Sequence, residues 1–179
     1  MKIVVITQEK PRENEAKICN QMFRKGLEIL HLRKPGADRG EYENIIKQIE
    51  REYRNRIMIN EYYELIKTYG LKGAHLRFSE LNNYVKQRNE TIAVSCHSIT
   101  EVLLCQNKAD YVYLSPIFDS ISKKDYKSNL ESIKTDLQLI KTISLPVFAL
   151  GGVSADKLQI CKKLGFKGVV YLGHIWQNI

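Results

Sequence analysis

Residues 91–117, TIAVSCHSITEVLLCQNKADYVYLSPI, contain the pattern that decides the fold. Two apolar runs, 91–97 and 111–117, flank a stretch at 98–107 whose apolar residues recur at helical spacing. Strands buried on both faces have continuous apolar runs of this kind, and two parallel strands need a crossover connection between them. The stretch therefore predicts a β–α–β unit with parallel strands.

The same unit recurs along the whole chain. The predicted strands are 2–7, 29–33, 56–60, 73–77, 91–97, 111–117, 146–152 and 168–173, and the predicted helices are 14–26, 41–53, 63–70, 79–89, 98–107, 129–143 and 154–165, with a stub at 174–179. Eight units without a break in composition predict one domain over residues 1–179, a compact (β/α)8 TIM barrel with a truncated last helix. A doubly wound open sheet is the alternative, but the first strand lacks the GxGxxG turn typical of that fold.

Composition limits the classes of function. The chain has 179 residues, 44% of them hydrophobic, and a formal charge of +8. No apolar run reaches the length of a membrane span, and the amino-terminal run is predicted to be a strand rather than a signal peptide. The four cysteines, Cys19, Cys96, Cys105 and Cys161, have no CxxC spacing, which predicts reduced core residues of a cytoplasmic protein.

The positive charge is spread along the chain and no nucleic-acid-binding motif accompanies it. Most of it is interpreted as solvated helix surface. The partners expected are small phosphorylated molecules, with neither nucleic acid nor membrane, and a homo-oligomer remains open.

In a barrel of this kind, functional groups gather at the carboxyl ends of the strands, and phosphate often binds after strands seven and eight. The seventh predicted strand ends in Gly151 and Gly152, and the eighth ends in Gly173. Glycines allow close approach of the backbone to a ligand, so these ends predict a phosphate cup. The alternative is a tight turn from strand to helix.

The other strand ends are also polar. They supply cations and two acids, which together suit a pyrophosphate bridged by a metal ion: Arg33, Lys34, Arg77, Lys123, Lys124, Glu61 and Glu80. All four histidines lie in or just after predicted strands and lack the spacing of a zinc site, which indicates a polar barrel interior.

Several motifs resemble a known family in their order along the chain: HLRKPG, INEYYELIKTYGLKGAHL, VSCHSITEV, ADYVYLSPIFDSISKKD and PVFALGGVSADKL. They are similar to thiamine-phosphate synthase and to its relative, the thiazole tautomerase, over nearly the whole chain. The resemblance implies a TIM-barrel transferase of thiamine biosynthesis. Such an enzyme uses Mg²⁺ and joins hydroxymethylpyrimidine pyrophosphate to thiazole phosphate, releasing pyrophosphate.

The resemblance also implies roles for individual residues. Arg33, Lys123 and Ser95 are the expected catalytic residues, and Glu61 and Glu80 are the expected Mg²⁺ ligands. Substrate binding is assigned to His31, Asn60, His97, Ser120, Ser122, Gly151, Gly152 and Gly173. Two alternatives stay open: a tautomerase with His97 or His31 as its base, or a non-catalytic binder of phosphorylated ligands in the same pathway.

Four departures from the family pattern stand out. Pro35 occupies the position of a family lysine, while Lys34 comes one place early and would point to the other face of an extended chain. Glutamate replaces aspartate at both expected metal positions, and the eighth strand ends in bulkier residues than usual. The tautomerase has a histidine where this chain has Pro116, which favours the synthase.

Overall fold

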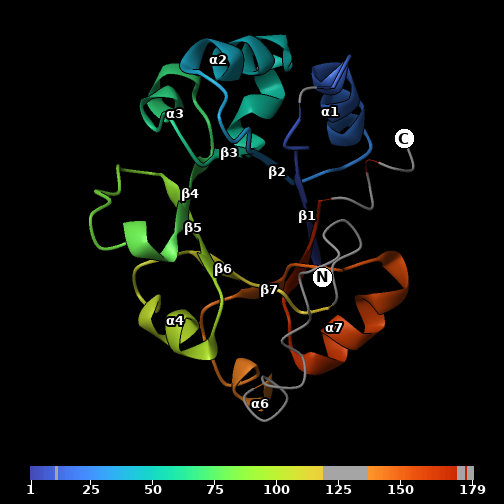
Figure 1. Cartoon of the computed structure of the whole chain (residues 1–179), viewed down its shortest axis with the longest axis vertical. Coiled ribbons are helices and arrows are strands. Elements are labelled where there is room, and N and C mark those ends of the chain that lie inside the picture. The colour runs from blue at the N-terminus through green and yellow to red at the C-terminus, as the bar shows by residue number, and fades with distance from the viewer. Residues whose placement is uncertain (11, 119–136, 173–175, 177–179) are drawn as a thin grey trace.

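The computed structural model describes residues 1–10, 12–118, 137–172 and 176. Within these residues, eight parallel strands close into a barrel in sequence order, and the helices lie around its outside (Figure 1). The strands are β1 (Lys2–Ile6), β2 (Ile29–Leu32), β3 (Ile57–Ile59), β4 (Gly73–Arg77), β5 (Thr91–Cys96), β6 (Tyr111–Leu114), β7 (Val147–Ala149) and β8 (Gly168–Tyr171). Every predicted strand is present, and pairing of β1 with β8 closes the predicted TIM barrel.

The helices follow the strands as the alternation predicts. They are α1 (Glu15–Arg24), α2 (Arg39–Gln48), α3 (Glu64–Tyr69), α4 (Ile99–Leu104), α6 (Leu137–Ile140) and α7 (Leu158–Leu164), with short 3₁₀ turns η1 (Arg51–Arg56), η2 (Phe78–Glu80) and η3 (Ala155–Lys157). Local sequence signals set their ends. Asp38 and Glu41 form a capping box at the start of α2, and Gly70 and Gly165 end α3 and α7 in the left-handed conformation.

The helix predicted at 79–89 is wrong. After β4 the chain makes only the η2 turn, and the following residues form a loop. Glu90 holds this loop from inside, because its buried carboxylate accepts hydrogen bonds from the hydroxyl of Tyr84 and from the backbone N–H of Gln87. Asn89 has a φ of 65°, which a helix cannot accommodate. A buried carboxylate that needs donors has overridden the weak helical pattern of the segment.

The core forms two layers, as expected for a barrel with covering helices. One group of residues fills the barrel interior, including Val4, Met58, Tyr113 and Phe148. Two larger groups pack between the strands and the helices. All four cysteines are free and buried, as predicted. None of the described helices is both long and apolar enough to span a bilayer.

Candidate active site

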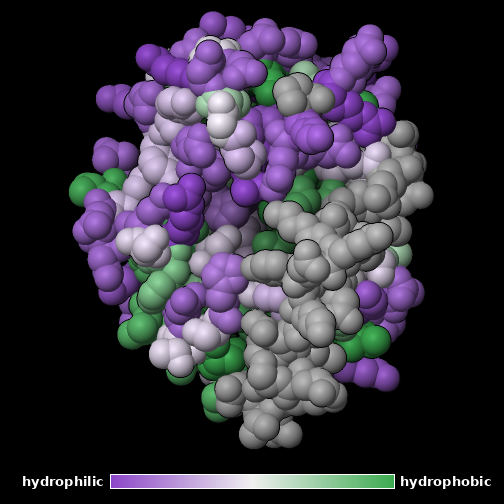
Figure 2. Space-filling view, viewed as in Figure 1, coloured by the Kyte–Doolittle hydropathy of each residue, from purple (hydrophilic) through white to green (hydrophobic). Residues whose placement is uncertain are grey.

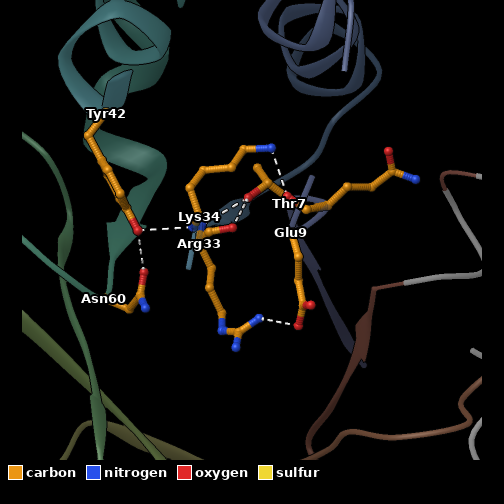
Figure 3. A network of polar contacts seen from close by, with 7 residues as sticks. Thr7, Glu9, Arg33, Lys34, Tyr42 and Asn60 are labelled. Carbon is orange, nitrogen blue, oxygen red and sulfur yellow. Dashed lines mark hydrogen bonds and ion pairs between the residues drawn. The ribbon is translucent and has the colours of Figure 1, made fainter. Parts of the chain in front are cut away.

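The ends of β1 and β2 are joined by a buried threonine. The hydroxyl of Thr7 accepts a hydrogen bond from the backbone N–H of Arg33 at 2.9 Å and donates to the Arg33 carbonyl at 3.0 Å. This double contact fixes the backbone of Arg33 while its side chain extends past the strand end (Figure 3). There the guanidinium donates to the carboxylate of Glu9 at 2.7 Å. A phosphate that binds Arg33 would either displace the carboxylate of Glu9 or share the guanidinium with it. Sequence reasoning did not identify Glu9.

Lys34 projects away from Arg33, as adjacent residues of an extended chain do (Figure 3). Its ammonium is 2.5 Å from the carboxylate of Glu15 on α1, and both side chains are buried. The same ammonium donates to the carbonyls of Gln8 at 2.7 Å and Lys10 at 3.3 Å. Lys34 therefore ties the β1–α1 connection to β2. Lys34 is therefore not one of the cations that were expected at the open end of the barrel. It also does not take the place of the family lysine, whose position is occupied here by Pro35.

One of the two expected metal ligands, Glu80, lies against Tyr63, whose hydroxyl is 3.5 Å from its carboxylate. Burial raises the pKa of the Tyr63 hydroxyl, and the nearby carboxylates of Glu80 and Glu61 raise it further. Glu80 also accepts a hydrogen bond from the backbone N–H of Arg77 at 2.7 Å. Glu61 comes two residues after β3 and Glu80 ends the η2 turn after β4, so the two acids follow the same end of neighbouring strands. Among the residues that the structure describes, no group of three or more His, Cys, Asp or Glu side chains could hold a metal ion.

Asn60 lies at the end of β3, beside these acids. Its side-chain oxygen accepts a hydrogen bond from Tyr42 at 2.9 Å, and its backbone carbonyl accepts one from Tyr63 at 2.9 Å. Figure 3 shows Asn60 and Arg33 near one another below the strand ends, with Tyr42 reaching in from α2. The structure therefore brings the expected pyrophosphate arginine and the expected substrate asparagine to the same place.

The barrel interior contains a buried cluster of histidines and tyrosines. Nε2 of His31 is 2.5 Å from the hydroxyl of Tyr113 and 3.1 Å from that of Tyr111. The ring of His75 packs edge-on against His31 with centroids 4.7 Å apart, and its Nε2 is 2.7 Å from the hydroxyl of Ser95. Two of the four histidines, His31 and His75, therefore form part of the polar barrel interior that was predicted.

Burial controls the protonation of this cluster. It lowers the pKa of His31 well below its ordinary value, and the neighbouring His75 adds to this effect. It lowers the pKa of His75 to about 3, with a further contribution from the guanidinium of Arg33. Both rings are therefore neutral at neutral pH, and His75 orients Ser95 as a neutral hydrogen-bonding partner. His97 lies apart from them: its ring is exposed and contacts the carbonyl of Ser115 at 3.0 Å.

The end of β7 is shaped by contact with the chain after β6. Gly151 has a φ of 92°, and a Cβ placed there would lie 2.9 Å from Cα of Pro116. The backbone N–H of Phe118 donates to the Gly151 carbonyl. A structural need thus explains this glycine without any ligand. Sequence reasoning also missed Lys157, whose ammonium donates to the Gly152 carbonyl at 2.8 Å and lies 4.8 Å from the ring centroid of Phe118.

We expect Gly151→Ala to destabilise the protein by roughly 1–3 kcal/mol, because alanine strains the left-handed backbone and meets the main chain of Pro116. Urea unfolding measures this loss. Gly36→Ala is the matched control for a left-handed glycine with open space around it, since nothing lies within 4 Å of an added Cβ there. Equal losses in the two variants would mean that the contact with Pro116 has no effect.

Four expected site residues, Ser120, Ser122, Lys123 and Gly173, lie outside the described residues, as does Lys124. Over the described part, Figure 2 shows hydrophilic side chains gathered on the half of the molecule that carries α1, α2 and α3, around a hollow near the middle of the view. Arg33, Asn60 and Glu61 follow β2 and β3, the strands that precede α2 and α3.

Nearly the whole sequence matches a known protein family. The family model described as thiamine monophosphate synthase matches residues 3–175. The chain belongs to this family. This family assignment agrees with the closed barrel of the structure.

Individual members agree with this assignment. A solved thiamine phosphate pyrophosphorylase from Bacteroides thetaiotaomicron is 34% identical, with a TM-score of 0.81, and the match covers 100% of this chain and 86% of that one. Thiamine-phosphate synthase of Latilactobacillus sakei is 29% identical over 98% of this chain and 84% of its own length. A pyrophosphorylase from Pyrococcus furiosus, at 21% identity and a TM-score of 0.75, supports the fold alone. These relatives do not favour the tautomerase alternative.

Proposed function

We propose that this protein catalyses thiamine-phosphate synthesis, joining hydroxymethylpyrimidine pyrophosphate to thiazole phosphate with release of pyrophosphate. The observation that supports the proposal is that Arg33 and Asn60 directly follow β2 and β3, with Glu61 next in the chain, in a protein of this family. A cation, an amide and two carboxylates are the groups that a metal-bound pyrophosphate needs.

The chemistry asks for little proton transfer. The bond between the pyrimidine methylene carbon and the pyrophosphate oxygen breaks, and the leaving pyrophosphate keeps the electron pair. The thiazole nitrogen then forms the new bond to that carbon. Arg33 is positioned to stabilise the negative charge of the departing group, and Asn60 can donate a hydrogen bond from its amide. Lys123, Ser120 and Ser122 are proposed to bind the same pyrophosphate.

Glu61 and Glu80 fit a Mg²⁺ site in one respect, because both acids come after the carboxyl ends of the paired strands β3 and β4. Mg²⁺ commonly takes one or two protein carboxylates and completes its shell with water and substrate phosphate. Glu61 and Glu80 are therefore the residues that would hold the ion. When bound, it would neutralise charge on the leaving pyrophosphate.

The remaining assignments follow the strand ends. Ser95, held by the neutral His75, is proposed to contact the pyrimidine, with His31 beneath it in the barrel. His97 is proposed to lie at the edge of the site. Gly151, Gly152 and Gly173 are proposed to receive the thiazole phosphate, and Lys157 is a cation beside that position.

The test mixes both substrates with Mg²⁺ and measures thiamine phosphate. We expect the wild type to form product and Glu61→Gln to lose about a hundredfold or more of the rate, because the amide keeps the shape and removes the charge. Pyrophosphate titration of the same proteins should show Mg²⁺-dependent binding only in the wild type. Glu28→Gln is the control, since Glu28 is exposed and precedes β2, at the opposite end of the barrel. The proposal fails if the wild type makes no thiamine phosphate.

A further inference from the structure

Tyr42 joins two strand ends of the site from outside the barrel. It lies on α2, fully buried, with its ring packed edge-on against Tyr62 at a centroid distance of 5.3 Å. Its hydroxyl is 2.9 Å from the backbone nitrogen of Lys34, directly after Arg33, and 2.9 Å from Oδ1 of Asn60 (Figure 3). One oxygen atom of an outer helix therefore contacts the ends of both β2 and β3.

The direction of these two hydrogen bonds follows from counting protons. The backbone N–H of Lys34 can only donate, so the hydroxyl of Tyr42 must accept there. Its single proton is then available for Asn60, and the hydroxyl donates it to the side-chain oxygen Oδ1. Burial raises the pKa of Tyr42 to about 12, so this proton stays in place at neutral pH. The two hydrogen bonds therefore run in one direction, from the N–H of Lys34 to the hydroxyl of Tyr42 and from that hydroxyl to Oδ1 of Asn60.

This order determines which end of the Asn60 amide is left for a ligand. With Oδ1 held by Tyr42, the Nδ2 group lies on the side away from that tyrosine, as Figure 3 shows. The main chain of Asn60 is also held in place, because its carbonyl accepts a hydrogen bond from Tyr63. A free asparagine could turn its amide by 180° and offer either a donor or an acceptor.

We propose that Tyr42 is a positioning residue that holds Asn60 with its N–H donor toward the substrate. Asn60 then recognises a hydrogen-bond acceptor, either a phosphate oxygen or an unprotonated ring nitrogen, and disfavours a ligand that presents a donor at the same point. The inference rests on the proposed function only for the identity of that substrate. The orientation of the amide is a property of the chain itself.

The first test reads the amide directly in the ¹⁵N-labelled full-length protein. The Asn60 side-chain amide signal is identified by its disappearance in Asn60→Asp. We expect Tyr42→Phe to shift or broaden that signal, because the amide loses the partner that fixes its orientation. Tyr62→Phe is the matched control, since it removes a hydroxyl that donates instead to the Ala37 carbonyl within the same ring pair. An unchanged Asn60 signal in Tyr42→Phe would overturn the proposal, whether or not the protein turns over.

The second test uses kinetics with the two thiamine-phosphate synthase substrates. Tyr42→Phe should raise KM for the pyrimidine pyrophosphate about tenfold, the effect of losing roughly one well-placed hydrogen bond, with a smaller change in kcat. Tyr62→Phe should change KM less than twofold. In an Asn60→Ala background, Tyr42→Phe should have no further effect on KM. An equal effect with and without Asn60 would overturn the proposal and indicate a purely structural tyrosine.

The wild type alone gives a third check if Tyr42→Phe does not fold. With the amide oriented as proposed, its nitrogen-bound protons lie away from the Tyr42 ring. A strong nuclear Overhauser effect between those protons and the ring would mean the opposite orientation and would overturn the proposal. A correct orientation in a protein that makes no thiamine phosphate would support the positioning role and refute the proposed activity.

Discussion

Lys34→Met is expected to lower the free energy of unfolding at pH 7 by about 3–5 kcal/mol, the usual cost of leaving one member of a buried ion pair without its partner. Lys34 and Glu15 are both almost completely buried, and the lysine also donates to the carbonyls of Gln8 and Lys10. Removing the ammonium leaves the buried carboxylate of Glu15 and the carbonyls of Gln8 and Lys10 without this donor. Urea unfolding followed by circular dichroism measures the loss.

The pH dependence of this variant identifies the cause. Burial already raises the pKa of Glu15, against the opposing effect of Lys34. Without the lysine the pKa should rise further. A carboxyl group whose pKa is higher in the folded than in the unfolded protein lowers the free energy of unfolding as the pH rises. The difference in free energy of unfolding between Lys34→Met and the wild type should therefore be largest at pH 7 and smaller near pH 5.

Two further variants separate the ion pair from general effects of lysine loss. The double variant Glu15→Leu, Lys34→Met removes both charges and should recover much of the lost stability. Lys47→Met breaks a surface pair with Glu43 and should lower the free energy of unfolding far less than Lys34→Met does, because solvent screens exposed charges. If Lys34→Met is no more harmful than Lys47→Met, the buried pair does not support the β1–α1 connection.

Sequence periodicity was sufficient to predict the barrel because each strand carries its own signal. Strand sequences such as IMI and YVYL are apolar throughout, as parallel strands covered on both faces must be. The helix predicted after β4 failed for a non-local reason, since Glu90 at the far end of that segment folds back to bind Tyr84 and Gln87. The apolar periodicity of a segment gives no information about a side chain outside the segment that binds the segment's hydrogen-bond donors.

Only those site residues whose location follows from their place at the end of a strand could be predicted from the sequence. Arg33, Asn60 and Glu61 follow strand ends, so the barrel itself places them at one mouth. The partners of these residues come from distant parts of the chain. Glu9 contacts Arg33, and Tyr42 contacts Asn60, through tertiary packing that no local pattern encodes. The same holds for Gly151, whose need for glycine comes from Pro116 on the neighbouring strand end.

The buried histidines make stability depend on pH in a direction that can be worked out. Burial lowers the pKa of both His31 and His75, the latter to about 3, whereas a histidine in the unfolded chain takes up a proton near pH 6.5. Below that pH the unfolded state binds more protons than the folded state. The free energy of unfolding must therefore fall as the pH falls, and this contribution is fully present only above about pH 6.5.

We expect the two histidines together to remove roughly 4–5 kcal/mol of stability between pH 6.5 and 4.5, from about 1.4 kcal/mol per pH unit for each neutral ring. The measurement is urea unfolding at pH 7, 6 and 5. His75→Asn should reduce the slope of stability against pH by about half in the acid range, because one of the two proton uptakes is lost, even though the variant is less stable at pH 7. If His75→Asn and the wild type lose stability in parallel, the interior histidine is not held neutral by the fold, and acid sensitivity must arise from the carboxylates.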